Sequence, residues 1–245
     1  MADIQAERLA EVFVELADTL VDEFDLIEFL QILTIRTSDL IEARAAGLLL
    51  ADNHGRLRLM AASDERAELL ELFQVQSLEG PCQDCYREGV AVSTTDLSTA
   101  ADRWPRFAPR AVAAGYRSVH AFPLRLRKDV IGALNLFGTE PGPMEPAGAR
   151  IVQALADVAT IGLLQERTIH RGDVLTEQLQ AALNSRIEVE QAKGALSQIH
   201  NCNTDEAFEL LRGYCRRNHL KLGDVARAVT SDPASVAELT TRRQA

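Results

Sequence analysis

The fold of the C-terminal part of this chain is decided by the stretch Arg186-Ile187-Glu188-Val189-Glu190-Gln191-Ala192-Lys193-Gly194-Ala195-Leu196. Its apolar residues recur at helical spacing, and Asn201-Cys202-Asn203 ends the segment. Asn203 is placed to cap a second helix, with Glu206 three residues later as in a capping box. A third helical pattern runs from Leu222 until Asp232-Pro233 stops it. We therefore predict a three-helix bundle, whose core of about forty-five residues would be marginal without a docking partner.

A long helical pattern precedes this bundle. After Pro141-Gly142-Pro143, an apolar stripe runs through Ile151, Leu155, Val158, Ile161 and Leu164 toward Leu183, with Gly162 and Gly172 as interruptions. A helical pattern of about forty residues without proline is long for a globular helix and favours a coiled coil or a dimerising stalk. The heptad is imperfect between Thr168 and Asp173, where a break is compatible with the pattern.

The preceding residues mix helices and strands. Helical periodicity covers 5–24 and 26–41, and two short apolar runs around Asp52-Asn53-His54-Gly55 predict a β-hairpin. Two further strand patterns, Ser118–Leu124 and Val130–Phe137, flank the turn Lys128-Asp129 and predict a second hairpin. Together these patterns predict an α+β domain with an antiparallel sheet flanked by helices.

Charge is distributed unevenly along the 245 residues. The net charge of −10 argues against non-specific nucleic-acid binding by the whole surface, but residues 186–245 carry +1 and residues 1–185 carry −11. Within 212–227 lie five basic residues and the single acid Asp224; the basic ones are Arg212, Arg216, Arg217, Lys221 and Arg227. Such a cluster is typical both of a phosphate-contacting surface and of a solvated helix face.

No targeting or membrane segment is apparent. No apolar run approaches the ~20 residues that a membrane span needs, and the first seven residues have no signal-peptide pattern. We therefore expect a cytoplasmic protein without a membrane partner.

The tail resembles the ANTAR domain. The stretch Arg186–Leu196 is similar to the opening of that domain, and Thr204–Arg212 and Lys221–Ala226 continue the match with their spacings kept. The sequence departs from many members at Ser197, where a bulky apolar residue is common. The resemblance implies an RNA-binding antitermination module that recognises paired stem-loops in nascent transcripts, usually as a dimer.

RNA contacts are therefore expected in this tail, through small residues that admit an RNA loop and basic residues that bind phosphate. The candidates are Arg186, Gln191, Ala192, Lys193, Gly194, Arg212, Arg216, Arg217 and Lys221. We expect Lys193 to be exposed, so that Lys193→Ala would weaken RNA binding without unfolding the tail. A purely structural role is the alternative for several of these residues. Arg212, Arg216 and Arg217 also suit a helix C-terminus. Gly194 suits close helix packing, and Tyr214 suits the core.

The front of the chain resembles a GAF domain over about 26–166. The resemblance rests on the segments Leu78–Cys82, Ser118–Leu124 and Ile131–Leu136. It implies a sensor that holds a cyclic nucleotide, haem, a bilin, another small molecule or nothing, so the cofactor stays unknown. Four residues are candidates for ligand or redox sensing: Cys82, Cys85, Trp104 and His120. Each also has a structural interpretation. Cys82 and Cys85 suit a pair of thiols at a turn, Trp104 suits the core under a loop, and His120 suits a buried position in a strand.

These patterns divide the chain into an N-terminal helix (1–25), a GAF-like sensor (26–166), a helical stalk (167–185) and an ANTAR domain (186–245). We expect a signal-responsive, dimeric regulator of transcription antitermination, with no catalytic residues and no metal site, since Cys82 and Cys85 lack two further ligands nearby. Three alternatives stay open. They are a signalling module whose tail docks a partner protein, a GAF-like enzyme, and a DNA-binding helix-turn-helix factor.

Overall fold

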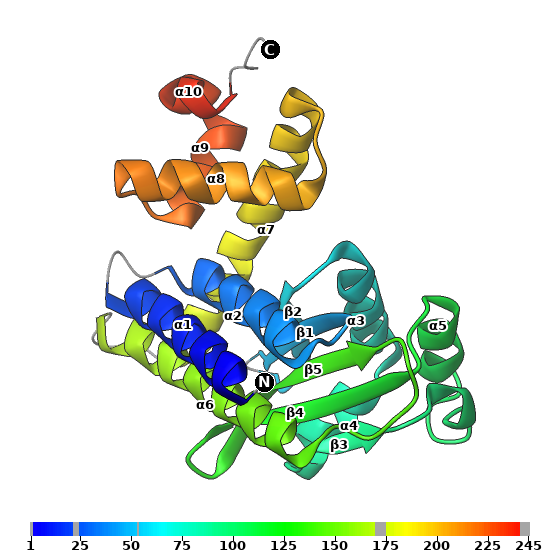
Figure 1. Cartoon of the computed structure of the whole chain (residues 1–245). Helices are drawn as coiled ribbons and strands as arrows, with labels where there is room; N and C mark the ends of the chain where they lie inside the picture. Colours follow the sequence, from blue (N-terminus) through cyan, green and yellow to red (C-terminus); the bar gives the residue numbers. More distant parts are fainter. Residues whose placement is uncertain (1, 22–24, 53, 170–174, 241–245) are drawn as a thin grey trace.

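The computed structural model describes residues 2–21, 25–52, 54–169 and 175–240, with side chains described for 7–19, 25–52, 54–163 and 185–239. A mixed helix-and-sheet body lies at one end of the molecule, and a bundle of short helices lies beside its first two helices (Figure 1). The predicted α+β domain followed by a helical tail is confirmed.

One antiparallel sheet of five strands forms the centre of the larger body. Its order is β2-β1-β5-β4-β3, with β1 at Ala45–Ala51, β2 at Leu57–Ala62, β3 at Val92–Thr94, β4 at Ser118–Leu126 and β5 at Asp129–Gly138. Both predicted hairpins are present, since β1 pairs with β2 and β4 pairs with β5. The two hairpins join through the β1–β5 pairing, in which Leu48 faces Leu134.

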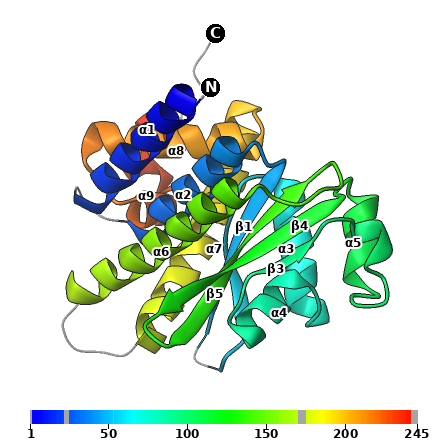
Figure 2. The ribbon, with the colours of Figure 1, turned by 60° about the horizontal axis from the view of Figure 1, so that its bottom comes forward.

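Helices cover both faces of the sheet (Figure 2). On one face lie α1 (Ala2–Val21), α2 (Leu26–Ile41) and α6 (Pro146–Ile169); on the other lie α3 (Glu65–Ser77), α4 (Pro81–Glu88), the turn η1 (Leu97–Thr99) and α5 (Phe107–Ala113). Side chains alternate along β4, so that Phe122 and Leu124 join the core under α2 and α6, whereas Val119 and Ala121 join the core under α3 to α5.

The predicted stalk is divided between two helices. Helix α6 ends at Ile169 and α7 covers Leu175–His200, and the two run in different directions (Figures 1 and 2). The possible break between Thr168 and Asp173 falls largely on residues 170–174, which lie outside the described part. Leu155 of the expected stalk stripe is buried in the core of the sheet domain, whereas Ile161 is exposed. The first part of that stripe therefore serves the sheet domain.

The tail forms the predicted three-helix bundle from the end of α7, α8 (Thr204–Asn218) and α9 (Leu222–Ser231), followed by η2 (Pro233–Val236) and α10 (Ala237–Thr240). Asn203 and Glu206 make the expected capping box at the start of α8. The buried side chains of the bundle belong to the same apolar cluster as those of α1 and α2. The bundle thus obtains its docking partner from the sheet domain of its own chain. None of the described helices is long and apolar enough to cross a membrane.

Candidate nucleic-acid interface

The nine candidate residues of the tail differ in accessibility. Gln191, Arg216, Arg217 and Lys221 are exposed, and Gly194 is partly exposed. Ala192, Lys193 and Arg212 are buried, and the side chain of Arg186 retains only 14% of its exposure. The covered residues include three of the basic ones, Arg186, Lys193 and Arg212, and acidic side chains lie beside each of them.

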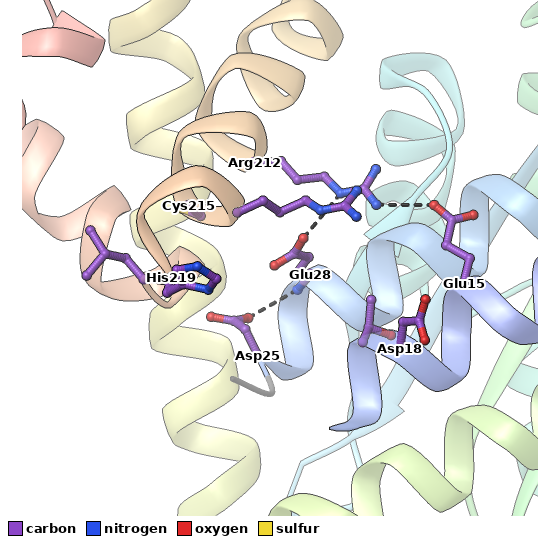
Figure 3. A pocket seen from close by; sticks show the side chains of 10 residues that line it. Glu15, Asp18, Asp25, Glu28, Arg212, Cys215 and His219 are labelled. Carbon is purple, nitrogen blue, oxygen red and sulfur yellow. Dashed lines mark hydrogen bonds and ion pairs between the residues drawn. The ribbon is translucent and has the colours of Figure 1, made fainter. Parts of the chain in front are cut away.

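Arg212 points from α8 into the sheet domain. Its guanidinium lies 3.1 Å from Oε1 of Glu15 on α1 and 3.2 Å from Oε1 of Glu28 on α2 (Figure 3). Burial raises the pKa of Glu28, and the attraction of Arg212 only partly opposes this effect. The pKa of Glu15 is lowered, first by its hydrogen bond to Arg36 and further by Arg212. A charge as buried as Arg212 requires such partners, because leaving it unpaired in a low-dielectric site is costly.

A narrow cleft of about 130 Å³ surrounds this ion pair, lined by α1, α2 and α8 (Figure 3). At its edge Asp25 has two roles. Its Oδ1 accepts the backbone N–H groups of Ile27 and Glu28, which caps α2, while its Oδ2 accepts the N–H of Gly223 at 3.0 Å. One carboxylate therefore fixes the start of α2 and holds the start of α9 against it.

Arg186 ties α7 to the other side of the sheet domain. Its guanidinium donates to Glu68 of α3 at 2.9 Å and to the carbonyl oxygen of Leu59 in β2. The Thr204 hydroxyl at the start of α8 donates to Glu65, also on α3. Acidic side chains of α1, α2 and α3 thus pair with residues of the tail at two separate places.

The expected exposure of Lys193 is wrong, since only 7% of the residue is accessible. Its Nζ lies 3.0 Å from both carboxylate oxygens of Glu190, one turn earlier on α7, and 6.0 Å from the ring centroid of Phe208 on α8. Helical spacing explains the first contact, because residues three apart share a face. The second arises from the packing of α8 on α7, which the spacing within one helix does not reveal.

The acidic partners Glu15, Asp25, Glu28 and Glu68 were not among the predicted site residues. The excess negative charge of residues 1–185 was the one available signal. It could not identify these positions, because the contacts join residues more than 100 positions apart.

The four candidate sensing residues are not brought together. Cys82, Cys85 and Trp104 lie in the core under α3 to α5, whereas His120 lines a cavity on the opposite face of the sheet. Trp104 is packed edge-to-face on Phe107 and donates its indole N–H to Asp84. In the part of the chain that the structure describes, no cluster of three or more His, Cys, Asp or Glu side chains is arranged to hold a metal ion.

Both thiols of the Cys-x-x-Cys pair are fully buried. Burial raises the pKa of Cys85 to about 12 and that of Cys82 well above its ordinary value. We expect iodoacetamide at pH 7 to alkylate the half-buried Cys202 first, and Cys82 and Cys85 on the order of a hundredfold more slowly, because the thiolate is the reactive form. Peptide mass spectrometry over time measures this, with urea-unfolded protein as the control. Alkylation of Cys82 in the folded chain as fast as in urea would contradict it.

The chain is thus a two-domain protein. An α+β domain with a helix-covered sheet is docked to a helical module through the ion pairs described above. The chain belongs to the GAF-domain family: the GAF domain model matches residues 25–163, and the ANTAR domain model matches residues 177–229. GAF and ANTAR domains are sensor and regulatory domains.

Solved structures agree on the fold of the sheet domain. A GAF domain of an Acinetobacter phosphoenolpyruvate-protein phosphotransferase is 16% identical, with a TM-score of 0.54 over 71% of this chain and 100% of that one. The free methionine-R-sulfoxide reductase of Neisseria meningitidis, in complex with its substrate, is 18% identical, with a TM-score of 0.54 over 69% of this chain and 93% of that one. A comparison with curated protein sequences found no match.

Proposed function

We propose that this chain is an RNA-binding regulator of transcription antitermination, in which the GAF domain receives a signal and the ANTAR domain binds stem-loops in nascent transcripts. The observation that carries the proposal is the ANTAR match over the helical module, on whose surface Arg216, Arg217 and Lys221 remain exposed. These three cations lie at the end of α8 and the start of α9, where they offer phosphate contacts.

The described arrangement is, in this proposal, the one with low RNA affinity. Arg186 and Arg212 would contribute phosphate contacts, but carboxylates of α1, α2 and α3 already occupy both guanidiniums. A signal would raise RNA affinity by binding better to an arrangement in which these ion pairs are broken.

Recognition of paired loops needs two ANTAR modules, so the proposal includes a homodimer. Part of α6 is available for such contacts, since Ile161 is 54% exposed on the side away from the core. The place of action would be the cytoplasm, where transcripts are made.

The proposal is tested by selecting transcripts from lysate with the full chain and measuring their affinity by filter binding over a range of salt concentrations. Arg216→Gln/Arg217→Gln should lower RNA affinity about tenfold at physiological salt and reduce the salt slope by about 2, because two phosphate contacts are lost. Both side chains are exposed, so the melting temperature should stay unchanged.

Arg87→Gln, on the exposed side of α4, is the matched control and should leave RNA affinity unchanged. Equal affinity of the double variant and the wild type would exclude this surface as the RNA site. Binding of duplex DNA of the same sequence as tightly as the stem-loop would favour a DNA-binding factor. If the full chain retains a protein from the lysate and no RNA, the result would favour a signalling module whose tail docks a partner protein.

A further inference from the structure

A cavity of about 740 Å³ lies on the α2 and α6 face of the sheet, away from the contact between the two domains. Its walls are the C-terminal end of α2, the ends of β4 and β5, and the segment 140–148 that leads into α6. This volume is within the range of about 300–1,000 Å³ that small-molecule sites occupy. The opposite face, under α3 to α5, is filled by packed side chains.

The inner wall of the cavity is mainly apolar and includes the imidazole ring of one histidine. Leu40 and Leu136 are buried there, and Ile41 and Met144 lie beside them. His120 also lines the cavity, although it is only 6% exposed. Its Nδ1 lies 3.0 Å from Oγ of Ser93, and no other hydrogen bond to the ring occurs within the described residues, which leaves Nε2 available. Burial lowers the pKa of His120, so the ring is neutral at pH 7.

Charges at the rim select against anions. Glu42, Glu140 and Glu145 contribute three carboxylates, whereas Arg8 contributes one guanidinium, which already donates to the carbonyl oxygen of Asp39. The local field therefore favours a neutral or cationic occupant over an anionic one.

We infer that this cavity is a small-molecule site for an apolar compound, neutral or cationic, that forms one hydrogen bond with Nε2 of His120. Apolar walls with one or two placed polar groups are the usual construction of such sites. The inference does not rest on RNA binding, and it holds whether or not the tail binds RNA.

The experiment titrates the full chain with Nile red, a neutral apolar dye, and follows the dye's fluorescence. We expect saturable binding of one dye per chain, and at least tenfold weaker binding of the anionic dye 8-anilinonaphthalene-1-sulfonate. Gly148→Leu should fill the cavity and weaken Nile red binding at least tenfold. A Cβ at this position would lie 3.6 Å from Cγ of Met144 and 3.8 Å from Cδ1 of Ile41, which is ordinary van der Waals contact, and both of these residues line the cavity.

Two further measurements decide the outcome. His120→Phe should weaken binding of a dye-competing apolar imidazole, 4-phenylimidazole, by more than it weakens binding of biphenyl, because only the former can bond to Nε2. Circular dichroism should show that both variants keep the wild-type fold; if either unfolds, Gly148→Ala and His120→Gln replace them. The inference is overturned if Nile red does not bind, or if it binds folded Gly148→Leu or Gly148→Ala as tightly as it binds the wild type.

Discussion

Glu28→Lys is expected to raise the RNA affinity of the full chain on the order of a hundredfold, and Glu28→Gln on the order of tenfold. Glu28 lies 3.2 Å from Arg212, and its side chain is 16% exposed. The neutral variant leaves Arg212 with Glu15 of α1 as its remaining partner outside the tail, whereas the lysine places a like charge beside it. The ten- to hundredfold change corresponds to a destabilisation of the docked arrangement by about 1.4–2.8 kcal/mol.

The control for this series is Glu11→Lys and Glu11→Gln. Glu11 lies on the exposed side of α1, the helix next to α2, and its substitutions make the same charge changes. Filter binding to the selected transcript should then show a graded increase for the Glu28 variants and none for the Glu11 variants. If the affinities of all five proteins coincide, the docked arrangement does not oppose RNA binding, and this part of the proposed function is wrong.

Glu71→Gln is expected to stabilise the protein by about 3 kcal/mol at pH 7. Glu71 is fully buried in α3, where its oxygens accept the side-chain N–H groups of Asn135 and Gln74, each at 2.7 Å. Gly47 of β1 leaves room for it, because a Cβ there would lie 2.4 Å from Oε1 of Glu71. Burial raises the pKa of this carboxyl from 4.5 to about 8. The variant keeps the shape of the group and removes the cost of protonating this carboxyl on folding at pH 7.

The sign of the pH dependence follows from this raised pKa. The unfolded chain loses the Glu71 proton above pH 4.5, whereas the folded chain keeps it until about pH 8. The free energy of unfolding therefore falls as pH rises across this window, by on the order of 4 kcal/mol from this group alone.

Urea unfolding at pH 5, 6, 7 and 8 measures this effect. The difference between wild type and Glu71→Gln should widen steadily with pH, whereas the exposed-site control Glu145→Gln should follow the wild type. A constant difference over this range would show that Glu71 is ionised in the folded chain.

Local sequence signals were sufficient for α2, for both hairpins and for the three helices of the tail. The predicted range 26–41 agrees with α2 because Asp25 caps the helix with its own side chain, and this signal is local. The capping box at Asn203 and Glu206 is local for the same reason. The run Ser118–Leu124 likewise indicates a strand by its own composition, and it is buried on both faces of the sheet.

The candidate site was less predictable, because its key contacts join distant residues. Arg212 looked like a free cation on a helix end, yet its partners are supplied by α1 and α2. Lys193 was expected to be exposed beside the small residues Ala192 and Gly194, yet α8 covers it. The length of the apolar stripe in α6 suggested a stalk, but a stripe does not reveal whether its partner is another chain or the sheet beside it.

The carboxylates beside Arg186 and Arg212 have a further consequence for how the protein would respond to its ionic surroundings. A free guanidinium keeps mobile anions near it, and the ions displaced on both sides contribute to the entropy gained when RNA binds. Here Glu68, Glu15 and Glu28 are permanently attached counter-ions. When RNA binds, the guanidiniums of Arg186 and Arg212 exchange a carboxylate partner for a phosphate. Few mobile anions are released at these two positions. Binding by the full chain would therefore vary less with the salt content of the cell than the number of its basic contacts suggests.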